Sequence, residues 1–238
     1  MTTLFISDLH LDPAQPGITQ QFLQFVARAE GRTEALYILG DLFEAWLGDD
    51  DPEPEYRRVV AALRKLRDSG TRIGFMHGNR DFLVGERFCA ATGTKLLADP
   101  SVHEIGGVRT LLMHGDTLCT DDLDYQNWRR IARSETWQRE FLAKPLAERR
   151  RAIIDMREKS KEVVQAKPAD IMDVNDAAVA SALRAHAVTR LVHGHTHRPG
   201  RHALTIDGRP AERWVLPDWY GRGGYLEIGR GAPRLVRF

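Results

Sequence analysis

Cysteine is nearly absent from this sequence. Its 238 residues include only Cys89 and Cys119, which lie far apart and form no Cys-x-x-Cys pattern. The sequence therefore argues against a disulfide framework and a thiolate zinc site, and it favours a reducing compartment. Apolar runs of the about 18–20 residues that cross a bilayer are missing as well. The first apolar run, residues 4–6, is broken at once by Ser7 and Asp8, so we expect no signal peptide.

An excess of one charge is also missing. The 34 Lys and Arg residues against 33 Asp and Glu residues give a formal net charge of +1, which argues against nucleic-acid binding. The motifs of a serine nucleophile elbow (Gly-x-Ser-x-Gly), a Walker loop and a zinc peptidase (His-Glu-x-x-His) do not occur. The length fits one large α/β domain, or one domain with a cap.

What the sequence does contain is a set of apolar runs that end in polar side chains. The run Ala35–Leu39 stops at Gly40 and Asp41, as a buried strand of a parallel sheet does. Four more apolar runs end in the same way, at Ser7-Asp8-Leu9-His10, Gly78-Asn79-Arg80-Asp81, His114-Gly115-Asp116 and Gly194-His195-Thr196-His197. Open α/β sheets bind ligands at the carboxyl ends of their strands, so we expect these side chains to meet.

The other apolar patterns predict strands that alternate with helices, and hence an α/β fold. The strands expected before the tail are residues 3–6, 36–39, 72–77, 108–113 and 191–193. Helices are expected from about Thr19, as the N-cap, and over residues 55–69 and 86–91. Strand-like runs at 204–207, 213–216 and 225–228 predict a second sheet region, mixed or antiparallel, in the tail.

Residues 120–173, which we call the helical insertion, differ from the rest of the chain in their pattern of apolar residues. They show no strand pattern, and their aromatic and aliphatic residues recur at helical spacing. From Trp128 to Lys167, twelve Lys and Arg residues face six Asp and Glu residues, so this stretch has a net charge of +6. Two readings stay open from the residues alone. The insertion is either a plain helical cover of the sheet or a lid for an anionic, partly apolar ligand. The acidic run Asp49–Asp51 is expected to be a solvated turn.

Seven side chains at the strand ends carry atoms that bind metals: Asp8, His10, Asp41, Asn79, His114, His195 and His197. The spacing of Asp8 and His10 lets both side chains reach the same side of an extended segment, as does that of His195 and His197. Mixed carboxylate, imidazole and amide donors suit Mn²⁺, Fe²⁺ or zinc better than calcium. Seven ligands are too many for one tetrahedral ion but fit two octahedral ions that share Asp41. Such a pair of ions hydrolyses phosphate esters or anhydrides with a bridging water as the nucleophile.

Asp-x-His, Gly-Asp, Gly-Asn-x-Asp, His and Gly-His-x-His, in this order, resemble the motifs of the calcineurin-like metallophosphoesterases. The resemblance implies a fold of two packed sheets flanked by helices. It also implies two ligand sets that share Asp41. One set is Asp8, His10, Asp41 and His197, and the other is Asp41, Asn79, His114 and His195.

One residue departs from the usual Gly-Asn-His-Asp motif of that family, because Arg80 stands in place of histidine. Histidine can protonate a leaving group, whereas arginine stays charged and only stabilises negative charge. The departure favours a leaving group that needs no strong acid, such as the phosphate released from a pyrophosphate bond. We expect Asp81 to orient Arg80. The catalytic residues are then Asp41, Asn79, Arg80 and His114.

The stretches around these motifs (residues 38–46, 113–120 and 193–199) are similar to one branch of the superfamily, which hydrolyses a UDP-linked diacylated glucosamine lipid in the lipid A pathway. The likeness implies an enzyme with two Mn²⁺ ions per chain. Metal-activated water attacks the α-phosphate, and UMP and 2,3-diacylglucosamine 1-phosphate are released. It implies a single domain, residues 1–238, in which residues 120–173 form a cap that holds the acyl chains. It also implies peripheral binding at the cytoplasmic face of the inner membrane and no nucleic-acid partner. The substrate contacts carried over are Asn79, Arg80, Asp122, Ser160, Val164, Lys167 and His195.

Two other functions are alternatives to this one. A soluble nucleotide pyrophosphatase or phosphodiesterase of the same superfamily would use the same metal ligands but would gain nothing from acyl chains. A non-catalytic scaffold with this fold is disfavoured, because all seven ligand positions keep residues that can bind a metal.

Overall fold

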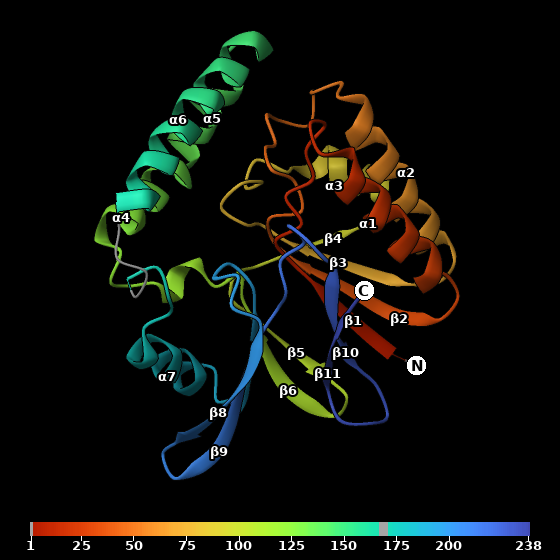
Figure 1. Ribbon diagram of the computed structural model, residues 1–238, viewed down its shortest axis with the longest axis vertical. Coiled ribbons are helices and arrows are strands. Elements are labelled where there is room, and N and C mark those ends of the chain that lie inside the picture. Colours follow the sequence, from red (N-terminus) through yellow and green to blue (C-terminus); the bar gives the residue numbers. More distant parts are fainter. Residues whose placement is uncertain (1, 167–170) are drawn as a thin grey trace.

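The chain forms two β-sheets that pack face to face. The computed structural model describes residues 2–166 and 171–238, without the side chains of residues 161–166. The first sheet has the strand order β11-β10-β1-β2-β3-β4, and the second has the order β5-β6-β7-β9-β8 (Figure 1). The strands of the first sheet are β1 (Thr2–Ile6), β2 (Thr33–Leu39), β3 (Arg72–Met76), β4 (Lys95–Leu97), β10 (Gly224–Ile228) and β11 (Arg234–Arg237). Those of the second are β5 (Ser101–Ile105), β6 (Val108–Leu112), β7 (Arg190–His193), β8 (Gly200–Ile206) and β9 (Arg209–Val215).

Strands β1 to β4 run parallel, and most residues of β1, β2 and β3 are buried on both faces, which explains their continuous apolar sequences. Phe5 of β1 packs between the sheets with Leu112 and Val192 of the second sheet. Its neighbours Leu4 and Ile6 face the other way, toward the helices. Alternating side chains thus build two separate cores from one strand.

Three helices cover the outer face of the first sheet: α1 (Pro16–Ala29), α2 (Pro54–Asp68) and α3 (Glu86–Thr92) (Figure 1). One helix, α7 (Asp176–Ala185), packs Val179 and Leu183 against the outer face of the second sheet. Helices on both outer faces and two sheets between them confirm the predicted fold class.

The helical insertion contains α4 (Leu123–Ala132), α5 (Glu135–Leu142) and α6 (Leu146–Ala166). In Figure 1, α5 and α6 extend away from the group formed by α1, α2 and α3. Phe141 of α5 is nevertheless buried in the core beneath that group, and Ile153 and Met156 of α6 pack on its edge. No helix in the described ranges is long and apolar enough to cross a membrane.

The acidic run Asp49–Asp51 contains the expected turn, at residues 49 and 50, but only Asp50 of the three residues is exposed. Asp49 accepts hydrogen bonds from Trp46 Nε1, Gly85 N and Phe88 N, and so it caps the start of α3 from a distant loop. Asp50 and Asp51 form ion pairs with Arg149 and Arg150 of α6. The rest of the run is not solvated because most of its partners lie 36 residues or more away along the chain.

Several element boundaries and pairings also differ from the prediction. Helix α1 begins at Pro16, since proline is favoured in the first helical turn, and Thr19 lies inside the helix rather than at its cap. The runs at 204–207 and 213–216 belong to β8 and β9, which pair antiparallel in the second sheet, as expected for the tail. The run at 225–228 instead joins the first sheet, where β10 pairs antiparallel with β1.

Candidate active site

The seven predicted ligands follow five parallel strands and meet beyond their carboxyl ends. Asp8 and His10 follow β1, Asp41 follows β2, Asn79 follows β3, His114 follows β6, and His195 and His197 follow β7. Two overlapping groups of acids and histidines place one ligand atom of each member within 4.8 Å of the others. These groups are Asp8, His10 and His197, and Asp8, Asp41 and His114.

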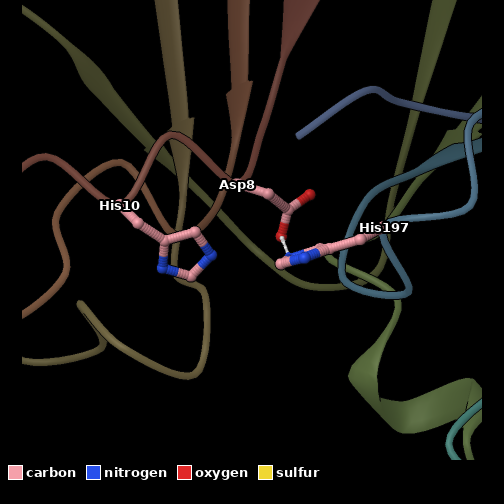
Figure 2. A group of neighbouring side chains, drawn as sticks. All are labelled: Asp8, His10 and His197. Atoms are coloured by element: carbon pink, nitrogen blue, oxygen red, sulfur yellow. Dashed lines mark ion pairs between the residues drawn. The ribbon is translucent and has the colours of Figure 1, made fainter. Parts of the chain in front are cut away.

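The first group is formed by Asp8 with two imidazoles. Figure 2 shows the Asp8 carboxylate directed at the His197 ring, with His10 on the opposite side. Asp8 Oδ1 lies 3.4 Å from His197 Nε2, and His10 Nε2 lies 3.7 Å from Asp41 Oδ2. The backbone N–H of His195 donates to both oxygens of Asp8, at 3.1 and 2.9 Å, and so ties the end of β7 to the end of β1.

Asn79 joins the remaining ligands. Its Oδ1 lies 3.1 Å from His114 Nε2 and 3.0 Å from His195 Nδ1. His114 Nε2 also lies 3.8 Å from Asp41 Oδ2. Asp41 is therefore close to members of both predicted ligand sets, which is the position that a shared ligand requires.

The backbone at this site is unusual. Seven non-glycine residues of the described chain have a positive φ between 51° and 69°. Five of them are predicted ligands: Asp8, His10, Asp41, His195 and His197. Non-glycine residues rarely adopt this backbone conformation, which costs about 1–3 kcal/mol for each residue. Residues that do adopt it are concentrated at functional sites.

The glycines beside the ligands are needed for space. A Cβ atom on Gly78 would lie 2.1 Å from Asp41 Oδ1, and one on Gly194 would lie 2.2 Å from Ser7 Oγ. Only glycine, which has no Cβ atom, lets the strand ends that carry the ligands approach each other this closely.

The donor set fits a divalent cation. His10 Nδ1 lies 2.7 Å from Glu44 Oε2, and His114 Nδ1 lies 2.8 Å from the carbonyl oxygen of Leu39. Both acceptors require a proton on Nδ1, so in the neutral imidazole that binds a metal each Nε2 presents the lone pair. His10 Nε2 is buried and has no hydrogen-bond partner among the described residues. A bound cation would supply that partner.

The electrostatic field at the site favours positive charge. Burial alone would lower the pKa of His114, but the carboxylates of Asp41, Asp116 and Asp8 raise it to about 9. Burial also opposes the charged form of Asp8, yet the hydrogen bond with His197 and the nearby imidazoles hold its pKa below the usual range. Burial and the adjacent His114 lower the pKa of His195 to about 4, so this ring is neutral.

Asp81 has a different task from the one expected. It is fully buried, and its oxygens accept backbone hydrogen bonds from Gly78 and Leu42, each at 2.8 Å. The expectation that Asp81 orients Arg80 is therefore wrong, because its short side chain turns back to join the ends of β2 and β3. Burial and the neighbouring Asp41 raise the pKa of Asp81 to about 6.

Arg80 is held through its backbone. Its N–H donates to Asp41 Oδ1 at 2.8 Å. Its Nε is buried and has no hydrogen-bond partner in the described chain. Burial opposes the charged form of Glu44, but the hydrogen bond with His10 and the charge of the Arg80 guanidinium lower its pKa, so the guanidinium lies near that carboxylate with a donor still available.

Asp116 is a residue of the site that the ligand pattern did not identify. It is fully buried and accepts hydrogen bonds of 2.7 Å from Tyr125 Oη and Arg129 Nε, both on α4. Arg133, one turn further on, donates from Nη2 to the carbonyl oxygen of Gly78 at 2.8 Å. The loop that carries His114 is thereby connected to the helical insertion. The sequence did show Asp116 at the end of a strand, but its partners could not be inferred.

The predicted substrate contacts in the helical insertion remain predictions. Asp122 caps α4 by accepting a hydrogen bond of 3.1 Å from Tyr125 N, and Ser160 is half-buried on α6. The side chain of Val164 and all of Lys167 lie outside the described residues.

Comparison with known proteins decides the family. Residues 1–199 match the calcineurin-like phosphoesterases. This chain belongs to the calcineurin-like phosphoesterase family. The predicted resemblance and the prediction of a hydrolase are confirmed, and the family implies divalent metal ions at the site.

Relatives and a solved structure agree with the family assignment. The chain is 49% identical over 238 residues to a protein from Chromohalobacter salexigens named UDP-2,3-diacylglucosamine hydrolase, a match that covers 100% of this chain and 97% of the relative. A protein of the same name from Escherichia coli is also 49% identical, with 100% and 99% covered. The structure of an archaeal phosphodiesterase is similar in fold, with a TM-score of 0.50, 11% identity and full coverage of both chains.

Proposed function

We propose that this phosphoesterase hydrolyses the pyrophosphate bond of UDP-2,3-diacylglucosamine and releases UMP and 2,3-diacylglucosamine 1-phosphate. The observation that carries the proposal is the convergence of seven ligand residues beside Arg80, in a chain that is 49% identical over its full length to hydrolases named for this substrate. The function places the chain in lipid A biosynthesis.

Two Mn²⁺ ions are proposed for the site, with Asp41 as the shared ligand. Asp8, His10 and His197 would complete one ligand set, and Asn79, His114 and His195 the other. When bound, the ions supply Lewis acidity, which lowers the pKa of water and offsets the charge of phosphate oxygens.

The chain's own residues would bind and orient the pyrophosphate. Arg80, whose backbone N–H bonds to Asp41, carries a permanent positive charge, and this charge suits a leaving group that departs as a phosphate. The side chains of Asn79 and His195 lie next to each other, and both are proposed to contact the substrate as well. Since phosphate is a good leaving group, no side chain needs to act as a strong general acid.

The helical insertion is proposed as the cap that receives the acyl chains. It carries exposed apolar side chains on its outer surface, with Leu123 70%, Ile131 54% and Ile154 51% exposed. Arginines on the same helices add positive charge. An apolar and basic surface of this kind binds reversibly to anionic lipid, which agrees with peripheral binding to the inner face of the inner membrane.

The test of the proposal is product analysis in ¹⁸O-water. We expect the Mn²⁺-loaded enzyme to cleave UDP-2,3-diacylglucosamine and to place the label in UMP. UDP-N-acetylglucosamine, which lacks the acyl chains, is the matched substrate and should be cleaved far more slowly. Equal rates for the two would instead identify a soluble nucleotide pyrophosphatase. Label in the sugar phosphate would show that the attack occurs on the other phosphorus.

A further inference from the structure

Glu44 lies between a predicted metal ligand and the helical insertion. Its Oε2 is 2.7 Å from His10 Nδ1, and its Oε1 is 3.4 Å from Arg157 Nη2 on α6. The side chain is 19% exposed, so the protein excludes most of the water around it. One carboxylate therefore contacts both the ligand and the helix.

The backbone fixes where this carboxylate can reach. Glu44 N donates to the carbonyl oxygen of Leu11 at 3.0 Å, and Leu11 pairs with Phe43 as an isolated parallel bridge. The segment after Asp41 thus runs beside the segment that contains His10. This register places the Glu44 side chain opposite the imidazole edge.

The contact decides which nitrogen of His10 can bind a metal. A carboxylate accepts hydrogen bonds, so Nδ1 carries the proton and the lone pair resides on Nε2. Tyr220 stacks on the same ring, with the centroids 5.0 Å apart and the planes 12° from parallel, but stacking does not distinguish the two nitrogens. Among the described contacts of His10, the one with Glu44 sets the tautomer.

We propose that Glu44 is a positioning residue that keeps His10 in its metal-binding form and ties that ligand to helix α6 through Arg157. The inference rests on the metal centre proposed above. A plain role in docking α6 is the alternative. Asp50 and Asp51 already pair with Arg149 and Arg150 on that helix and have no contact with a ligand.

The test is the Mn²⁺ affinity of the full-length protein, measured by titration calorimetry on metal-free samples. Loss of a carboxylate that orients a ligating histidine weakens metal binding by about 10–100-fold. We expect a loss of this size in Glu44→Ala and a smaller one in Glu44→Gln, whose amide oxygen can still accept from Nδ1. Excess Mn²⁺ should restore turnover in both variants.

Asp51→Ala is the matched control, because it removes an ion pair with the same helix but leaves His10 untouched. Its Mn²⁺ affinity should equal that of the unchanged protein. Equal affinity in Glu44→Ala and the unchanged protein would overturn the inference, as would an equal loss in Asp51→Ala. If Glu44→Ala does not fold, Glu44→Gln decides the test. The inference is then overturned if Glu44→Gln binds its full complement of Mn²⁺ with the affinity of the unchanged protein and its turnover does not rise with excess Mn²⁺. An unchanged protein that binds no Mn²⁺ would contradict the proposed function itself.

Discussion

Asp8, His10 and Asp41 each hold a left-handed backbone conformation and each carry a predicted ligand atom. Asp8 and His10 therefore do not lie on an extended segment, as their spacing predicted, because their left-handed conformations direct both side chains toward the site. The cost of about 1–3 kcal/mol for each such residue is offset by the packed sheets beneath them.

Gly78→Ala tests how tightly the loops are packed. The added Cβ would lie 2.1 Å from Asp41 Oδ1, so Asp41 or the loop before Asn79 must move. We expect at least a tenfold loss of Mn²⁺ affinity and a loss of turnover, with little change in far-UV circular dichroism. Gly17→Ala is the control, because its Cβ would meet nothing within 4 Å. Normal metal binding by Gly78→Ala would show that the loops are more adaptable than the structure indicates.

Arg80→His tests the role of the permanent charge. The metal ligands touch the backbone of Arg80 and not its side chain, so the metal content should stay the same. Turnover of the pyrophosphate substrate should fall by about 10–100-fold, because a histidine at neutral pH is mostly uncharged. Metal analysis and steady-state kinetics on the same sample measure both. Loss of metal from this variant would mean that Arg80 supports the ligands themselves.

The seven ligand positions could be inferred from the sequence because each follows an apolar strand directly. Glu44 and Asp116 could not be assigned in the same way. Glu44 acts on His10, 34 residues earlier, and Asp116 binds side chains of α4 that come later in the chain. A residue that supports a ligand has no spacing rule of its own, since its partner is determined by the fold.

At the scale of elements, the sequence predicted most of the strands and the amphipathic helices α1, α2 and α3, and it missed β4, β5, β11 and α7. The strand β4 has three residues and β11 has four, and both lie at edges of the first sheet. Helix α7 is rich in alanine and buries only Val179 and Leu183, which gives a weak apolar stripe. Elements this short follow from pairing with neighbours more than from their own pattern.

The first turns of helix α6 are fixed to the body of the protein by Arg149. The guanidinium of Arg149 is 3% exposed and donates to Asp50, to the carbonyl oxygen of Leu47 and, through Nε, to that of Lys144. A buried arginine that donates to three acceptors from two segments holds those segments together.

Arg149→Ala should therefore loosen the helical insertion. It removes a donor to the buried carbonyl oxygen of Leu47, at a cost of about 1–3 kcal/mol. We expect faster hydrogen exchange in α5 and α6 and a lower urea midpoint. Arg151→Ala is the control, because Arg151 is exposed and such substitutions change stability by less than about 0.5 kcal/mol. Equal effects of the two variants would contradict the role given to Arg149.

At the scale of the whole molecule, metal binding should stabilise the fold, because the ligands come from both sheets. At a free Mn²⁺ concentration of about 100 times its Kd, the gain is about 2.7 kcal/mol. For a domain of this size that corresponds to a rise in Tm of about 5–10 °C. Calorimetry after chelation and after readdition of Mn²⁺ measures the shift. Asp41→Ala, which lacks the shared ligand, should show almost none, and a full shift in that variant would contradict the bridging role.

The pairing of β1 with β10 has a consequence for folding. The strand that leads to Asp8 has its antiparallel neighbour in Gly224–Ile228, which lies far along the chain. The backbone N–H of Trp219 also bonds to the carbonyl oxygen of Asp8, at 3.1 Å. Because contacts between segments that are distant in sequence close large loops, we expect this edge of β1 to pair late in folding. A chain without β10 would leave that edge of the first sheet open to pairing with another chain.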